Sequence, residues 1–117
     1  MSRLLMNEFV IPVSIKLAEK IGLHEAMFLQ QLHYWLQQSE NVHEGYKWVY
    51  NTYEDWHKQL PLLSVNQIRR IVRELEKKKL IVTGDINRLK MDKTKWYRIN
   101  YEAVEQVCES VNNKNVN

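Results

Sequence analysis

Residues 64–77 read SVNQIRRIVRELEK, and this stretch decides the fold that we expect. Ser64, with Gln67 three residues later, is typical of a capping box at the start of a helix. The aliphatic residues that follow recur at helical spacing and predict one buried stripe: Ile68, Ile71, Val72 and Leu75. Because these residues face inward, the amides and cations between them point outward or lie on the flanks of the helix.

The residues before this helix predict a partner helix only a few positions away. Thr52, with Asp55 three residues on, fits a second capping box, and Pro61 stops the helix. Its apolar face consists of Tyr53, Trp56 and Leu60. After residue 80, β-branched residues 81–83 and strand-like residues 94–99 flank a basic, polar stretch, which predicts a β-hairpin. Helix, tight turn, helix and hairpin is the order of a winged helix-turn-helix.

The first half of the chain is predicted to supply the rest of the core. Pro12 can start a short helix that Gly22 caps, and residues 24–38 have the spacing of a core-facing helix. Residues 39–45 predict a loop, and residues 46–50 predict a strand.

The carboxyl-terminal residues carry a weak helical stripe and then become polar. We expect one winged helix-turn-helix domain over residues 1–109, followed over residues 110–117 by a polar tail or the start of a linker. The predicted fold class is α+β, mostly helical, with a small antiparallel β-hairpin as the wing.

Positive charge is concentrated in one segment. The chain as a whole has a formal charge of +3, but residues 68–98 hold eleven Lys and Arg against four Asp and Glu. The segments on both sides of it are net acidic. Such a distribution is an electrostatic footprint for a polyanion.

The residue types in this segment favour duplex DNA as that polyanion. Asn and Gln can form two hydrogen bonds with adenine, Arg can do so with guanine, and the second helix of the pair enters the major groove. The candidates for base contacts are Asn66, Gln67, Arg69, Arg70 and Arg73. The candidates for contacts with phosphates, on this helix and on the wing, are Ser64, Lys77, Arg88, Lys90, Lys93 and Lys95. Charges on one amphipathic helix usually solvate an exposed face, so the basic hairpin beside it is what favours DNA.

Other chemistries find little support in the sequence. We expect each of the four tryptophans on the buried side of its element, with Tyr46 and Tyr97 the exposed rings on which a single-stranded base could stack. The four histidines lack metal-ligand spacing and are interpreted as surface or capping residues. Without a glycine-rich phosphate loop, nucleophile elbow or paired carboxylates, the chain is predicted to be no enzyme and to need no cofactor.

The composition is that of a protein of a reducing compartment. Cys108 is the one cysteine among the 117 residues, so an internal disulfide is excluded and the cytoplasm is the expected location. The apolar run at residues 4–6 is too short for a signal peptide, and no stretch reaches membrane-spanning length.

Four segments together resemble one family. They are residues 22–26 (GLHEA), 30–36 (QQLHYWL), 47–56 (KWVYNTYEDW) and 89–97 (LKMDKTKWY). They are similar to the amino-terminal winged-helix domain of replication initiator or replisome-organiser proteins, related to DnaD, from phages and mobile elements of low-GC Gram-positive bacteria. The likeness spans roughly residues 17–101.

The resemblance implies origin recognition or primosome assembly by a homodimer or higher homo-oligomer. The family often adds a carboxyl-terminal domain that handles DNA or the helicase-loading machinery, and its absence here puts contacts with replisome or helicase-loader proteins in doubt. Two alternatives stay open. A protein-interaction or self-assembly module would place the basic face against an acidic partner. A small transcriptional repressor would bind DNA in the same way at a different site.

Overall fold

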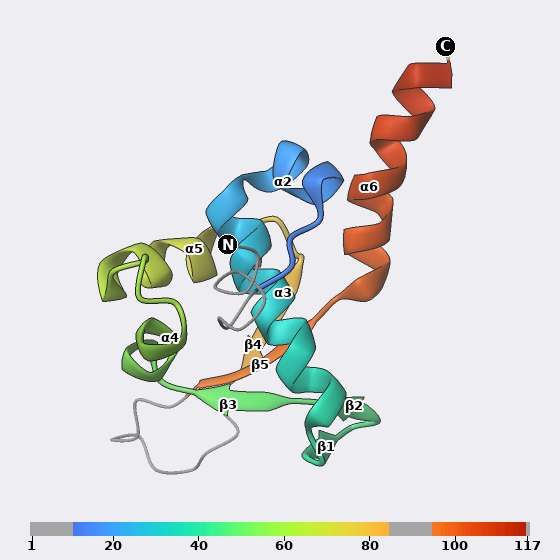
Figure 1. Cartoon of the computed structure of the whole chain (residues 1–117). Coiled ribbons are helices and arrows are strands. Elements are labelled where there is room, and N and C mark those ends of the chain that lie inside the picture. Colours follow the sequence, from blue (N-terminus) through green and yellow to red (C-terminus); the bar gives the residue numbers. More distant parts are fainter. Residues whose placement is uncertain (1–10, 85–94, 117) are drawn as a thin grey trace, which may run out of the picture.

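A three-stranded antiparallel sheet, covered on one face by helices, organises the fold (Figure 1). The computed structural model describes residues 11–84 and 95–116, with side chains up to residue 109. The elements within these ranges are α2 (Ile15–Ile21), α3 (Leu23–Gln38), β1 (Val42–His43), β2 (Tyr46–Lys47), β3 (Val49–Asn51), α4 (Tyr53–Gln59), α5 (Val65–Lys77), β4 (Ile81–Gly84), β5 (Lys95–Ile99) and α6 (Tyr101–Val116). The chain is therefore an α+β domain with antiparallel strand pairs.

The last strand in the sequence lies in the middle of the sheet. The strand order is β3-β5-β4, and β5 is antiparallel to both neighbours. The predicted pairing of residues 81–83 with residues 94–99 is confirmed by the register of β4 and β5. Side chains alternate across β5, so Tyr97 and Ile99 are buried under the helices, while Trp96 and Arg98 lie on the opposite face.

The core sits between α3, α4, α5 and this sheet. Three aromatic rings form its centre, because the centroid of Phe28 lies 4.9 Å from that of Trp56 and 6.2 Å from that of Tyr97. The aliphatic stripe predicted for α5 is fully buried against them: Ile68, Ile71, Val72 and Leu75. This confirms the inward face of α5 and therefore fixes which of its side chains remain outside.

The helix α2 begins later than the sequence predicts. It starts at Ile15 instead of Pro12, because the hydroxyl of Ser14 accepts the backbone N–H of Leu17 at 3.2 Å and caps the helix. Its predicted carboxyl-terminal cap is confirmed. Gly22 has φ +106°, and its N–H donates to the carbonyl of Ala18.

A second, two-stranded sheet joins two residues of the predicted loop to the start of the predicted strand. The strands β1 and β2 pair across Glu44 and Gly45, both of which have positive φ. The single strand predicted over residues 46–50 is thus wrong, because it is divided at Trp48. The buried indole of Trp48 separates β2, which pairs with β1, from β3, which pairs with β5.

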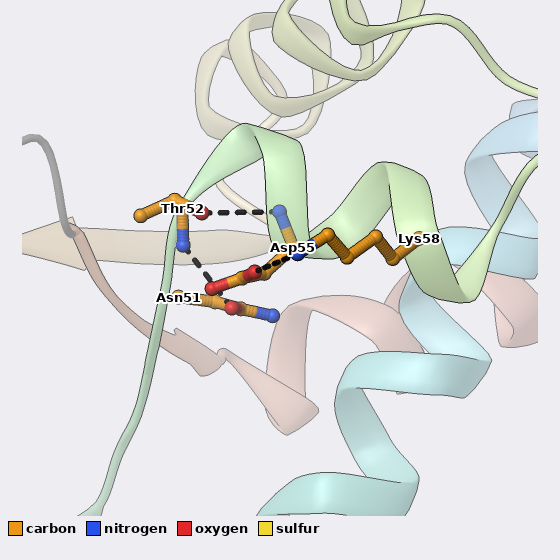
Figure 2. Close-up of polar contacts among 4 residues, drawn as sticks. All are labelled: Asn51, Thr52, Asp55 and Lys58. Carbon is orange, nitrogen blue, oxygen red and sulfur yellow. Dashed lines mark hydrogen bonds and ion pairs between the residues drawn. The ribbon is translucent and has the colours of Figure 1, made fainter.

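The start of α4 is capped differently from the prediction (Figure 2). The hydroxyl of Thr52 accepts the N–H of Asp55 at 3.0 Å, as a capping box requires. The backbone N–H of Thr52, however, donates to the side-chain oxygen of Asn51 at 3.1 Å. The carboxylate of Asp55 instead lies 3.7 Å from the ammonium group of Lys58. Thr52 therefore caps the helix as predicted, but Asn51 replaces Asp55 as the acceptor of the Thr52 N–H.

The final helix extends away from the rest of the domain (Figure 1). Its first half contacts α2, and its partly buried side chains are Ala103, Val104, Val107 and Cys108. The polar tail predicted to begin at residue 110 continues the helix instead, since the backbone of α6 is helical as far as Val116.

Candidate nucleic-acid interface

The turn between α4 and α5 is short and firmly held. Leu60 and Leu63 are buried on either side of exposed Pro61 and Leu62. The ring nitrogen Nδ1 of His57 lies 2.6 Å from the carbonyl oxygen of Leu63. Because a carbonyl can only accept, Nδ1 carries the proton in this contact. These anchors fix the direction in which α5 leaves α4.

The outer face of α5 presents a polar and basic stripe. Asn66, Arg70, Arg73 and Lys77 are all exposed, and their spacing of three or four residues places them in one row along the helix. Within residues 11–84 and 95–109, no carboxylate is paired with Arg70 or Arg73. Glu74 lies exposed on the flank of this row. Glu76 turns away from it and accepts a hydrogen bond from the hydroxyl of Thr83 on β4.

The amino-terminal turn of α5 is closed by a complete capping box. The hydroxyl of Ser64 accepts the N–H of Gln67 at 3.1 Å, and the N–H of Ser64 donates to the side-chain oxygen of Gln67 at 2.8 Å. This confirms the predicted cap. It also engages the amide oxygen of Gln67, one of the predicted base contacts, whereas the NH₂ group of Gln67 has no partner among the described residues.

Arg69 is held differently from its neighbours. Its Nη1 donates to the side-chain oxygen of Asn66 at 2.9 Å, and its guanidinium carbon lies 5.2 Å from the ring centroid of Tyr53. The ammonium group of Lys95 lies 5.3 Å from the same centroid. The structure thus brings Arg69, a predicted base contact, and Lys95, a predicted wing contact, to the same ring. Tyr53 was predicted to belong to the apolar face of α4.

Of the four cations predicted on the wing, Lys95 alone lies among the residues that the structure describes. Arg88, Lys90 and Lys93 lie outside the residues that the structure describes, while Lys95 begins β5 at the root of the hairpin. Ser64 and Lys77 are both exposed, at opposite ends of α5. The exposed side chains therefore run from the capping box of α5 along its whole length.

Three predictions about aromatic residues are wrong. Trp96, expected on the buried side of its strand, lies on the face of β5 opposite the helices, beside Tyr50. Tyr97 is fully buried, because the alternation of β5 turns it into the core beside Trp56. Trp35 is 36% exposed, and its indole N–H donates to the side-chain oxygen of Gln59 at 2.6 Å. Tyr46 is exposed as expected, but one face of its ring lies 3.9 Å from the guanidinium carbon of Arg98.

Burial changes the acidity of two tyrosines. It raises the pKa of Tyr97 well above its usual range, with a further increase from nearby Tyr53 and an opposing effect of Trp56. The Tyr97 hydroxyl has no partner at hydrogen-bond geometry in the described part of the chain. Burial also raises the pKa of Tyr101, whose hydroxyl lies 2.8 Å from Nδ1 of His33.

Two further observations concern other classes of site. No group of three or more His, Cys, Asp or Glu side chains in the described ranges is arranged to hold a metal ion. None of the helices there is long and apolar enough to cross a membrane.

Comparison of the chain with protein-family models, with curated proteins and with solved structures gives no match.

Proposed function

We propose that this chain binds duplex DNA as a winged helix-turn-helix, with α5 in the major groove and the β4–β5 hairpin against the backbone. The observation that carries the proposal is the row of Asn66, Arg70, Arg73 and Lys77 along α5, whose arginines no described carboxylate neutralises. The element order supports it. A strand, two helices joined by a tight turn, and a hairpin that completes the sheet follow one another from β3 to β5.

The division of labour on α5 follows from position. Asn66 and Arg70 lie in the first half of the helix, which is the part that penetrates the groove, so they are the proposed base contacts. Lys77 lies in the last turn, where a cation also interacts favourably with the helix dipole, and it is proposed to contact phosphate. Sequence preference would then depend on the first turns of α5, and overall affinity on the cations around them.

The family resemblance extends the proposal to a replication origin of a phage or mobile element, where the chain would act in initiation or primosome assembly as a homodimer or larger assembly. A repressor would use the same contacts at an operator. Selection of bound duplexes from a random pool, followed by sequencing, identifies the recognised site and distinguishes these two roles.

The binding itself is tested by titrating the selected duplex and a random duplex of equal length at several salt concentrations. Neutralisation of phosphates predicts that log affinity falls linearly with log salt, by about 0.9 per phosphate contact. Arg70→Ala should lose about 1–3 kcal/mol on the selected site and much less on random DNA. Lys93→Ala should weaken both alike. Lys47→Ala, which removes an exposed cation from β2, is the matched control and should change neither.

A protein-interaction module is the second candidate. Tyr34 and Trp35 form an exposed aromatic pair on α3, with ring centroids 5.0 Å apart, and aromatic residues are enriched at protein interfaces. Absence of duplex binding by the wild-type chain at low salt, or binding that ignores salt, would overturn the DNA proposal and favour this candidate.

A further inference from the structure

Three elements of the fold converge on the ring of Tyr53. Tyr53 is the first residue of α4, Arg69 lies in the second turn of α5, and Lys95 is the first residue of β5. The pairing of Asn51 with Lys95 sets the start of β5 beside the chain that enters α4. Each cationic group lies within 5.3 Å of the ring centroid, so the two are separated by at most about twice that distance.

Among the described residues, the partners of these two cations are neutral. Arg69 is restrained by the ring of Tyr53 and by the amide oxygen of Asn66, and Lys95 by the same ring. An aromatic face attracts a cation through its quadrupole and leaves the full charge in place, whereas a carboxylate would cancel it. Arg69 and Lys95 are therefore fixed in position and still able to attract an anion.

We propose that Tyr53 is a positioning residue that sets Arg69 and Lys95 to grip one stretch of the sugar–phosphate backbone, where α5 meets the wing. The inference rests on the proposed duplex binding and deepens it. Arg69 is reassigned from base contact to phosphate contact, because its side chain is held over the ring of Tyr53 and already engages Asn66. The Tyr53 hydroxyl, which has no hydrogen-bond partner in the described part of the chain, is a third donor for a phosphate oxygen.

The test compares Tyr53→Leu, Tyr53→Phe, Arg69→Ala and Lys95→Ala with the wild type, on the selected duplex and on a random duplex at several salt concentrations. Loss of the ring in Tyr53→Leu should weaken both duplexes equally, by roughly 3- to 10-fold. Tyr53→Phe keeps the ring and should lose only the contribution of the hydroxyl, roughly 2- to 3-fold. Arg69→Ala should reduce affinity for both duplexes alike and lower the salt slope by about one, in contrast to Arg70→Ala.

A double-mutant cycle separates positioning from a general loss of stability. The effect of Arg69→Ala should shrink in the Tyr53→Leu background, because the released guanidinium no longer contributes fully. Thermal unfolding of each variant shows whether it is folded. If Tyr53→Leu is not, the predicted effects of Tyr53→Phe and Arg69→Ala on the two duplexes decide the question.

Each outcome bears on the inference. If Tyr53→Leu and Tyr53→Phe bind both duplexes as tightly as the wild type does, the inference is overturned and the proposed function stays intact. The same holds if Arg69→Ala changes the site preference. A wild-type chain that binds no duplex would overturn both. Additive effects of Arg69→Ala and Tyr53→Leu would show that the two residues act separately and would also refute it.

Discussion

Substitution of Gln67 should separate the stability of α5 from its ability to bind DNA. The side-chain oxygen of Gln67 accepts the N–H of Ser64 at 2.8 Å, at the point where α5 is proposed to enter the groove. Glutamate at this position keeps that acceptor, since the capping box accepts either residue. It also places a negative charge in a first helical turn that now has none.

The two consequences have opposite signs. A carboxylate near the amino-terminus of a helix interacts favourably with the helix dipole, so Gln67→Glu should raise the free energy of unfolding by about 0.3–1 kcal/mol. The same carboxylate would face phosphates and would replace the one NH₂ group that remains free to donate. Affinity for the selected duplex should therefore fall by roughly tenfold or more, which corresponds to about 1.4 kcal/mol.

Gln67→Ala is the matched control, because it removes the acceptor without adding charge. It should lower the free energy of unfolding by about 0.5–1 kcal/mol, as expected for half of a capping interaction. Urea unfolding followed by circular dichroism measures stability, and fluorescence anisotropy of a labelled duplex measures affinity. A Gln67→Glu variant that is less stable than the alanine variant, or that binds as well as the wild type, would refute the reasoning.

Two further predictions concern stability. Gly22→Ala should lower the free energy of unfolding by about 1 kcal/mol in urea, because φ is +106° and any residue with a Cβ is strained there. The carboxylate of Glu25, whose Oε1 would lie 2.2 Å from the added Cβ, can move aside, so Gly45→Ala at φ +84° should lose a similar amount; no loss at Gly22 would contradict the reasoning. Tyr97→Phe should be neutral or stabilising by up to about 1 kcal/mol, since the buried hydroxyl has no partner in the described ranges. Because burial raises the pKa of Tyr97 above the ordinary value of 10.0, the wild type should lose stability as pH rises above about 10, where the unfolded tyrosine ionises first. The phenylalanine variant should lose less in alkaline unfolding, and an equal loss in both proteins would count against this explanation.

Local signals were sufficient for α5. The capping box at Ser64 and the aliphatic stripe after it are encoded within about a dozen consecutive residues, and both are present as predicted. The division at Trp48 was missed because β1 and β2 are exposed on both sides and carry no apolar alternation. The one available signal was Glu44-Gly45, whose positive φ values suit a tight hairpin turn.

The pairing of β3 with β5 could not be predicted. Nothing in the sequence near Tyr53 indicates that Lys95 lies above its ring, since this depends on the pairing of β3 with β5. The same pairing buries Tyr97, whose position on the inner face follows only from the register of the sheet. For the proposed interface, the sequence identified the basic side chains of α5 but could not show which of them are restrained by neutral partners.

The central position of β5 affects how the chain can fold during synthesis. Because β3 and β4 are joined only through β5, their inward edges have no strand to pair with until residues 95–99 leave the ribosome. The helical half of the core can assemble earlier, but without Tyr97 and Ile99 it lacks one wall. A nascent chain halted before Lys95 should therefore remain sensitive to proteases, because the native sheet forms only after residues 95–99 have emerged.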